Sequence, residues 1–307
     1  MPGKNPTDAL ESLLNRAERV LSRLEQTLPE APPALDWRSA IAFRWRRLGQ
    51  RGYLQAVRHP HALRLKDLRC IDAQKAEIVR NTRQFVAGRP ANNVLLWGTR
   101  GTGKSSLIKA LLNEFARDDL RLVEVNKHEL VDLPDIVEPL YGRPERFILY
   151  CDDLSFEADD PSYKALKVAL DGSISAAPDN LLIYATSNRR HLMPEFMHDN
   201  LQARAVEGEI HPGEAVEEKV SLSERFGLWL SFYPFSQPQY LDIVFYWLKR
   251  LGATVEPRDA VEKAALQWAL ARGSRSGRVA WQFTRDWAGR GEHTAAASPR
   301  SKRPTHK

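Results

Sequence analysis

The chain has 307 residues, of which 43% are hydrophobic, and it can bury one large core and a smaller second one. Its longest uncharged stretch, residues 226–241, is short and contains two prolines, so we predict no membrane-spanning segment. Two cysteines and the charges near its start, among them Lys4 and Asp8, favour a cytoplasmic protein over a secreted one.

Positive charge is concentrated in two places. Residues 38–69 hold nine Lys or Arg and one acidic residue, and residues 290–307 hold five and one. Since the net charge is only +6, the rest of the chain is mildly acidic. This distribution excludes a surface that is basic throughout. It predicts local basic patches, so that residues 38–69 or the C-terminal tail could bind nucleic acid.

The first predicted element is a helix over residues 8–28. Apolar residues recur there in steps of four and three, and Pro29 ends the pattern. Such a stripe fits either a helix packed on the chain's own core, which is the simpler interpretation, or a coiled-coil seam with a partner. Three prolines between residues 29 and 33 then form a stiff spacer.

A second helix is predicted from Trp37 to Gly49 or Gly52, which completes an N-terminal helical region over residues 1–64. The cationic face of this helix would contact phosphate backbones or an acidic partner, and a merely solvated face is the simpler alternative. The apolar face carries Trp37, Ile41, Trp45 and Leu48, and the cationic face carries Arg44, Arg47 and Arg51.

Residues 98–105 carry the strongest signal in the sequence. They match G-x-x-x-x-G-K-[ST], a phosphate-binding loop, between an apolar strand at 93–97 and a helix at 106–112. The glycines let backbone N–H groups point at phosphate oxygens, Lys104 would contact the β- and γ-phosphates, and the Ser105 hydroxyl would coordinate Mg²⁺. We therefore predict a site for ATP and Mg²⁺ formed by Gly98, Thr99, Arg100, Gly101, Thr102, Gly103, Lys104, Ser105 and Ser106.

Alternating strands and helices follow the loop, as in a parallel α/β sheet. A strand at 120–126 and a helix at 129–140 precede a buried strand, residues 147–151, that ends in two carboxylates. We expect Asp152 to hold Mg²⁺ and Asp153 to orient or deprotonate the attacking water, with Glu157 as a substitute base.

The next strand, residues 181–188, follows a helix at 161–174 and ends in Asn188, whose amide would hold the attacking water against the γ-phosphate. The remaining segments are a long loop or helical insertion at 189–222, a fifth strand at 227–235, and helices from Ser236 onward. We therefore expect a P-loop core over 65–235, a helical lid over 236–288, and a disordered basic tail over 289–307.

The order of these motifs resembles that of the AAA+ ATPases over roughly residues 65–289. Besides the P-loop and the paired aspartates, the shared motifs are Thr186-Ser187-Asn188, Ser223-Glu224-Arg225-Phe226 and Ser276-Gly277-Arg278. The sequences of residues 92–98, 218–227 and 232–235 more narrowly resemble a bacterial AAA+ family without an assigned function.

The resemblance implies a P-loop NTPase sheet of strand order 5-1-4-3-2 with a helical lid. It also implies that Asn188 acts as sensor 1, Arg225 as an arginine finger on a neighbouring subunit and Arg278 as sensor 2, while residues 68–89 line the adenine pocket. The sequence departs from the family pattern twice, because Asp153 stands in place of the usual Glu and Cys70 in place of a frequent Gly.

The function expected from these residues is Mg²⁺-dependent ATP hydrolysis in a homo-oligomer, coupled to remodelling or loading of a macromolecular client. The catalytic residues would be Lys104, Asp153, Asn188 and Arg225. An alternative, suggested by the short side chain of Asp153, is a nucleotide-gated binding module or loader that turns over little ATP.

Overall fold

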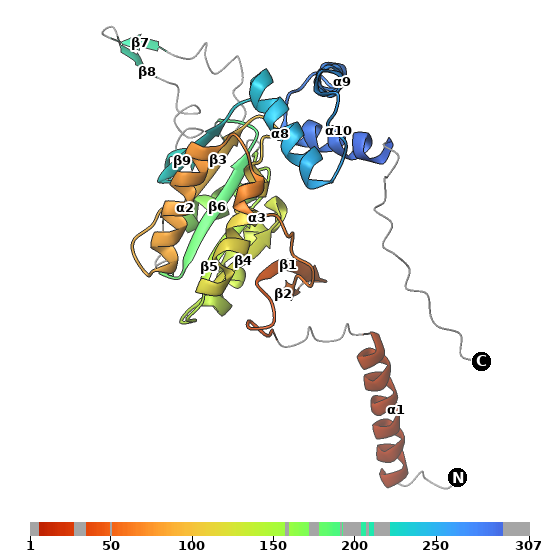
Figure 1. The fold of residues 1–307 in the computed structure, drawn as a ribbon. Coiled ribbons are helices and arrows are strands. Elements are labelled where there is room, and N and C mark those ends of the chain that lie inside the picture. Colours follow the sequence, from red (N-terminus) through yellow and green to blue (C-terminus); the bar gives the residue numbers. More distant parts are fainter. Residues whose placement is uncertain are drawn as a thin grey trace, which may run out of the picture.

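The computed structural model describes residues 6–27, 35–49, 51–156, 160–171, 178–190, 192, 204–206, 209–211 and 222–290. The body is a seven-stranded sheet with helices on both faces and a group of helices beyond its carboxyl edge (Figure 1). The central parallel strands are β3 (Val94–Gly98), β4 (Leu120–Val125), β5 (Arg146–Cys151), β6 (Leu181–Ser187) and β9 (Leu228–Phe232).

The strand order of the sheet is β2-β1-β4-β5-β6-β3-β9. Numbered along the chain from β3, the five central strands read 5-1-4-3-2 from the β9 edge, which is the order that the resemblance implies. The P-loop strand β3 therefore lies between β6 and β9, and the polar ends of β5 and β6 lie on its β6 side.

The helix predicted from Trp37 is wrong, because this segment forms a β-hairpin of β1 (Ala42–Leu48) and β2 (Arg51–Ala56). β1 pairs in parallel with β4 through residues 42–44, so part of the predicted N-terminal helical region belongs to the sheet. Burial alternates along β1, with Phe43 and Trp45 buried and Arg46 exposed, as a strand requires. The pairing with a strand about 80 residues away overrides the local helical spacing.

The arginines predicted to share one helical face are divided between the two faces of this hairpin. Arg44 donates from Nε to Glu124 Oε2 at 2.7 Å, and Arg47 donates from Nε to Asp132 Oδ2 at 2.6 Å. The hydrogen bond from Arg47 holds the pKa of Asp132 below its usual range, although burial opposes this. These two arginines are thus neutralised within the body instead of forming a continuous cationic face.

The two faces of the sheet bury separate clusters. One cluster packs against α2 (Asp72–Val86) and α3 (Lys104–Phe115), and it includes Leu96, Ile148 and Tyr184. The other contains the alternate strand residues, among them Leu95 and Leu149, and packs against helices on the opposite face. Those helices are η3 (Lys127–Asp132), α4 (Leu133–Val137), η4 (Glu138–Leu140) and α5 (Pro161–Asp171).

The helix predicted over 129–140 is therefore divided into short turns. Pro134 lies in the first turn of α4 and Pro139 in η4. A proline lacks the N–H that a continuing helix would donate, so it is favoured in a first helical turn and interrupts a longer helix. Two further 3₁₀ turns, η1 (Leu65–Asp67) and η2 (Ala116–Asp118), lie before α2 and after α3.

The lid predicted from Ser236 consists of α8 (Gln237–Arg250), α9 (Arg258–Ala271) and α10 (Gly277–Arg290). The Ser236 hydroxyl accepts from the Gln239 N–H, while the Gln239 side chain accepts from the Ser236 N–H, which caps α8. Residues of all three helices share the cluster that contains α2 and α3, so the lid and the core are packed together.

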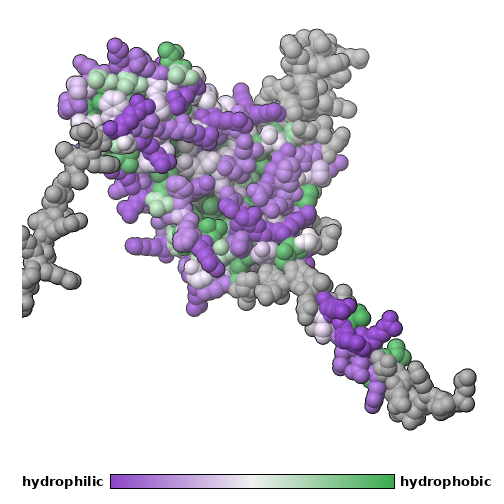
Figure 2. Space-filling view, turned by 90° about the vertical axis from the view of Figure 1, so that its right-hand side faces the viewer, coloured by the Kyte–Doolittle hydropathy of each residue, from purple (hydrophilic) through white to green (hydrophobic). Residues whose placement is uncertain are grey.

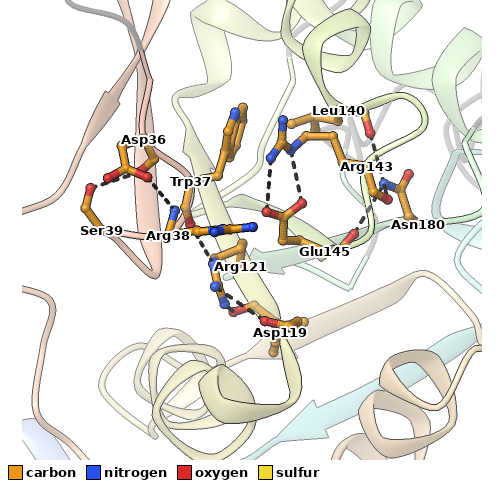
Figure 3. Close-up of polar contacts among 11 residues, drawn as sticks. Asp36, Trp37, Arg38, Ser39, Asp119, Arg121, Leu140, Arg143, Glu145 and Asn180 are labelled. Carbon is orange, nitrogen blue, oxygen red and sulfur yellow. Dashed lines mark hydrogen bonds and ion pairs between the residues drawn. The ribbon is translucent and has the colours of Figure 1, made fainter.

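The amino ends of the strands carry a polar cluster that fixes the segment before β1 (Figure 3). Arg143 pairs with the buried Glu145, and its guanidinium lies over the Trp37 ring at 4.7 Å from the centroid. The buried Arg121 donates to the Trp37 carbonyl at 3.2 Å. Asn180 donates to carbonyls of residues 140, 143 and 145. These contacts satisfy buried polar groups and position residues 35–40 for the hairpin.

Helix α1 (Pro6–Thr27) confirms the first predicted helix. Its described apolar side chains, Leu10, Leu13, Leu14, Val20 and Leu21, are more than half exposed, so they do not pack on the chain's own core. Within the predicted insertion the structure describes a small ribbon, β7 (Arg204–Val206) and β8 (Glu209–His211). None of the described helices is long and apolar enough to cross a membrane. Apart from its first two residues, the predicted tail 289–307 lies outside the described residues.

Candidate functional site

The loop between β3 and α3 has a backbone that requires glycine. Gly98, Gly101 and Gly103 have φ values of 125°, 77° and 105°. Gly98 ends β3 and is paired with Phe232 of β9, and a Cβ atom there would lie 2.0 Å from the Phe232 carbonyl oxygen, so the neighbouring strand also excludes a side chain. Gly103 is the N-cap of α3, and the first helical N–H groups therefore face the loop.

Lys104 lies inside this loop and is only 6% exposed. Its Nζ donates to the carbonyls of Gly98 at 2.7 Å and Thr99 at 2.9 Å, and to Asn188 Oδ1 at 3.2 Å. Burial lowers the pKa of Lys104 to about 8, although the nearby Asp153 and Asp152 act in the opposite direction. A cation is thus held at the centre of the glycine loop by weak neutral acceptors that phosphate oxygens could replace.

One carboxylate oxygen of Asp152 accepts hydrogen bonds from two hydroxyl groups. Ser105 Oγ donates to its Oδ1 at 2.7 Å, and Thr186 Oγ1 donates to the same atom at 2.6 Å. Burial acts to raise the pKa of Asp152, but these hydrogen bonds hold it below its ordinary value. Hydroxyl and carboxylate oxygens are the ligands that Mg²⁺ prefers, so the pair predicted to bind Mg²⁺ fits that ion.

Asp153 is held in a left-handed backbone conformation, with φ of 53°. Its N–H donates to Thr186 Oγ1 at 2.9 Å, so a single threonine positions both aspartates. The Asn188 amide donates to Asp153 Oδ1, and the Arg100 guanidinium lies 3.6 Å from Asp153 Oδ2. Both oxygens of this carboxylate therefore have partners.

These groups line one pocket with a volume of about 820 Å³ between the P-loop, the β5 and β6 ends and the lid. From the segment predicted to line an adenine pocket, Leu68, Arg69 and Ile71 contribute to the wall, whereas residues of α2 do not. The lid contributes Ile243, Trp247 and Trp281, so the end of the pocket away from the phosphate loop is lined largely by apolar and aromatic groups.

Cys70 has a φ of 61°, which explains why a glycine would fit at this position. Its Sγ lies 3.5 Å from Asp242 Oδ2 on α8, and burial, followed by this carboxylate, raises the pKa of the thiol to about 11. The neighbouring Arg69 pairs with the same Asp242. The buried Asp67 accepts hydrogen bonds from Tyr246 and Arg250 of α8. These contacts join the segment before α2 to the lid.

Arg278 is brought to the pocket by the start of α10. Its backbone N–H donates to the Gly101 carbonyl at 3.2 Å, and a Cβ atom at Gly101 would lie 3.1 Å from its own Cβ. Arg225 is not brought there, because its Nε donates to Asp171 at the end of α5 and it does not line the pocket. Glu157, the substitute base, lies outside the described residues.

Two contacts of this site were not predicted. The sequence predicts Thr186 only as part of a polar strand end, yet its hydroxyl is hydrogen-bonded to both aspartates. The sequence predicts Arg100 only as a residue of the P-loop, yet its guanidinium lies close to the Asp153 carboxylate. The sequence signal for Thr186 was a hydroxyl at the carboxyl end of the strand beside the aspartates, where parallel strands direct their terminal side chains to a common site.

Comparison with known proteins extends these observations. The family described as "Protein of unknown function (DUF815)" matches residues 38–291, and no curated protein matches the chain. A similar solved structure is that of a single-residue variant of Thermotoga maritima RuvB, with 16% identity and a TM-score of 0.50, covering 73% of this chain and 65% of that one. The chain therefore spans slightly less than two thirds of that RuvB chain.

Two further solved structures show weaker similarity. The Aeropyrum pernix ORC1 protein in complex with DNA has 18% identity and a TM-score of 0.48, covering 70% of this chain and 58% of that one. A chain of the HORMA:CdnC:Trip13 complex of E. coli MS115-1 has 13% identity and a TM-score of 0.43, covering 72% and 89%. At 16% identity the similarity to the RuvB structure shows the fold alone, which is that of the AAA+ proteins.

Proposed function

Because the chain belongs to the DUF815 family and has an AAA+ fold, we propose that it is a Mg²⁺-dependent ATPase. The observation that carries this proposal is the convergence of Lys104, Ser105, Asp152, Asp153 and Asn188, from three separate segments, on one pocket. A buried lysine in a glycine loop beside an aspartate that accepts two hydroxyl groups is suited to a nucleoside triphosphate and its metal ion.

In this proposal the phosphates occupy the glycine loop. Lys104 exchanges its bonds to the Gly98 and Thr99 carbonyls for phosphate oxygens, which are stronger acceptors. Ser105 and Asp152 would hold Mg²⁺, which supplies positive charge that neutralises the phosphates when it is bound. The apolar wall of Leu68, Ile243 and Trp247 suits a flat base such as adenine.

For hydrolysis, the carboxylate of Asp153 must either accept a proton from the attacking water molecule or orient that water molecule. Asn188 and Arg100 are its present partners, so a water molecule has to displace at least one of them. The bond from the Arg278 N–H to the Gly101 carbonyl supports a contact between the Arg278 side chain and the terminal phosphate, and lid movement would then report the state of the nucleotide.

Arg225 has a different place in the proposal. It lies outside the pocket of its own chain and is held by Asp171, which supports a role at the site of an adjacent subunit. We therefore infer a homo-oligomer that couples ATP turnover in the cytoplasm to remodelling or loading of a macromolecular client.

A second candidate function is a nucleotide-gated binding module that hydrolyses ATP slowly. It is favoured by Asp153, which is one methylene shorter than glutamate and already has partners on both oxygens. A single-turnover measurement with radiolabelled ATP separates the two candidates. Release of phosphate within seconds supports the ATPase, whereas stable bound ATP over many minutes supports the module.

The assignment of the site itself is tested by Lys104→Ala. The variant is expected to lose most ATP binding while its circular dichroism and thermal unfolding stay close to those of the unchanged protein, because a loop lysine contributes little to the core. Unchanged ATP affinity in a folded Lys104→Ala protein would refute the site.

A further inference from the structure

The β1–β2 hairpin has one buried face and one face that is open to solvent. Trp45 and Leu54 are paired in register on the buried face. On the opposite face Arg46 lies across from Tyr53, and Arg51 lies across from Leu48. Arg46 and Arg51 are exposed and have no acidic partner among the residues that the structure describes. The antiparallel register therefore places Tyr53 next to two guanidinium groups that no described carboxylate neutralises.

The chain continues this positive surface after β2. Arg58, Arg64 and Lys66 are exposed, and within the described parts of the chain no carboxylate pairs with their side chains. The one acidic residue of this stretch, Asp67, is buried under Tyr246 and Arg250 and does not offset the charge at the surface. We call Arg46, Arg51, Arg58, Arg64 and Lys66 the basic strip.

The backbone segments that carry the basic strip run along the α3 side of the sheet. Asn113 of α3 donates to the carbonyls of His61 and Leu63, which holds residues 61–63 along α3. Ala42, which is on the same face of β1 as Arg46 but is buried, belongs to the cluster that contains α3, so this face is on the α3 side. Figure 1 shows the hairpin at the edge of the sheet, and Figure 2, which views the molecule from that edge, shows a mostly hydrophilic surface.

The nine cations of residues 38–69 do not form the cationic helical face that the sequence predicts. Arg44, Arg47 and Arg69 are paired with Glu124, Asp132 and Asp242, so they contribute little to an external field. Of the other six, Arg38 lies before the hairpin, and the five of the basic strip lie on the hairpin and along the segment that follows it. Unpaired, exposed guanidinium groups are suited to a polyanion, since they can release its counterions without first breaking an internal ion pair.

The ring of Tyr53 favours nucleic acid over an acidic protein as the bound polyanion. Arg51, Tyr53 and Gln55 lie on the same face of β2, with Arg46 opposite Tyr53. Cations bind phosphates, while an aromatic side chain among them offers a stacking surface for a base. An acidic protein would need the cations alone. We propose that the open face of the hairpin and the basic strip form a binding surface for single-stranded nucleic acid.

In this arrangement Arg46 and Arg51 contact phosphates on either side of a base that stacks on Tyr53. Arg58, Arg64 and Lys66 extend the contact with the backbone toward the lid. The interaction is independent of base identity, because neither a guanidinium–phosphate contact nor stacking selects one base strongly. It is also independent of ATP hydrolysis, so it stands or fails separately from the proposed ATPase.

The test uses the full chain and a fluorescein-labelled 20-nucleotide oligothymidylate, with affinity measured by anisotropy between 50 and 300 mM NaCl, without ATP. Each lost phosphate contact reduces the slope of log K against log [salt] by about 0.7 for a single strand. The double variant R46E/R51E is therefore expected to flatten the slope by about 1.4 and to weaken binding at low salt. An unchanged slope would overturn the proposal.

The matched control is R89E/R117E, which makes the same change of charge. Both residues are exposed, and both lie at the amino edge of the sheet, before β3 and before β4. This control is expected to keep the slope of the unchanged protein. If it flattens the slope as much as the hairpin variant does, binding reflects overall charge and the surface assignment fails. The basic C-terminal tail is present in every protein compared.

The role of Tyr53 is tested with Tyr53→Leu and Tyr53→Phe. Loss of the ring in Tyr53→Leu is expected to weaken binding about tenfold without changing the salt slope, whereas Tyr53→Phe stays within twofold. Equal affinities for the two variants would overturn the stacking contact. Poly-L-glutamate serves as a competitor at equal charge concentration. If poly-L-glutamate competes as effectively as unlabelled oligothymidylate, the proposal is overturned and the partner is an acidic protein.

Discussion

Thr186 is the residue through which the two aspartates of the site are held together. Its hydroxyl donates to Asp152 at 2.6 Å and accepts from the Asp153 N–H at 2.9 Å. Valine has nearly the same shape without the hydroxyl, so Thr186→Val removes both hydrogen bonds with little change in packing. A hydrogen bond to a charged group contributes about 1.5–3 kcal/mol to stability, and the lower end applies because the Asp152 carboxylate opens to the pocket.

We therefore expect Thr186→Val to lower the free energy of unfolding by about 1–2 kcal/mol at pH 7. The affinity for Mg-ATP should fall about tenfold, while the affinity for ATP in EDTA changes little, because the lost contact orients the proposed Mg²⁺ ligand and not the phosphate loop. Urea unfolding followed by tryptophan fluorescence gives the first quantity, and titration with a fluorescent ATP analogue gives the second.

The dependence of this effect on pH follows from the lowered pKa of Asp152. A carboxylate whose pKa is lower in the folded state stabilises the protein fully at a pH above its unfolded-state pKa of about 3.9. This stabilisation is lost as the pH falls through its folded-state pKa. The difference in stability between Thr186→Val and the unchanged protein should accordingly shrink below about pH 4.

The control for this experiment is Thr82→Val. Thr82 is fully buried and bonds the Ile78 carbonyl and Tyr184 hydroxyl, away from the pocket. It should also destabilise the protein, yet leave the ratio of affinities with and without Mg²⁺ unchanged. Equal ratios for Thr186→Val and Thr82→Val would refute the reasoning that Thr186 positions the Mg²⁺ ligand.

Three further results are expected. Since burial lowers the pKa of Lys104 to about 8, this side chain loses its charge, and ATP affinity should fall, as the pH rises from 7 to 9. The affinity is measured by titration with a fluorescent ATP analogue. No decline would contradict a protonated Lys104 at the phosphates. Asp153→Asn should bind Mg-ATP and lose turnover in a phosphate-release assay, because the amide cannot act as a base; if Glu157→Gln alone abolishes turnover, the base is Glu157. If the arginine acts on an adjacent subunit, Arg225→Ala should lower turnover by about 10³ or more and change ATP affinity only a few-fold. Mixing this variant with Asp153→Asn should then restore part of the activity. Turnover that is independent of protein concentration would contradict this arrangement.

The phosphate loop could be predicted from the sequence because its chemistry is local. The three glycines are needed for positive φ values within six residues, and the lysine and serine follow directly. The lid and the five central strands could be predicted for a similar reason, since long apolar periods and clear caps define them. The fold and family predictions are confirmed, whereas the roles of Asp153, Asn188, Arg225 and Arg278 stay predictions.

The hairpin could not be predicted in the same way. Trp37, Ile41 and Trp45 satisfy helical spacing, but Trp37 lies before the hairpin and contacts Phe147 and Arg143 instead. The deciding interaction is pairing of β1 with β4, which is distant in sequence and invisible to a local pattern. Gly52 is a possible end of the predicted helix, but in the hairpin its lack of a side chain makes room for the Trp45 ring, 1.9 Å from where a Cβ would lie.

The contacts between residues 67–70 and α8 bear on how the lid can rotate. Asp67 is bonded to Tyr246 and Arg250, and Arg69 to Asp242, so the segment on the base side of the pocket is fastened to the lid. A rotation that kept these bonds would carry the segment with the lid as one rigid body. Since Asn113 holds residues 61–63 along α3, the bending points would then be residues 63–64, residues 70–71 before α2, and the chain between β9 and α8. In mechanical terms, the wall of the base pocket belongs to the moving part and the phosphate loop to the stationary part, so lid opening would pull the two ends of a bound nucleotide apart.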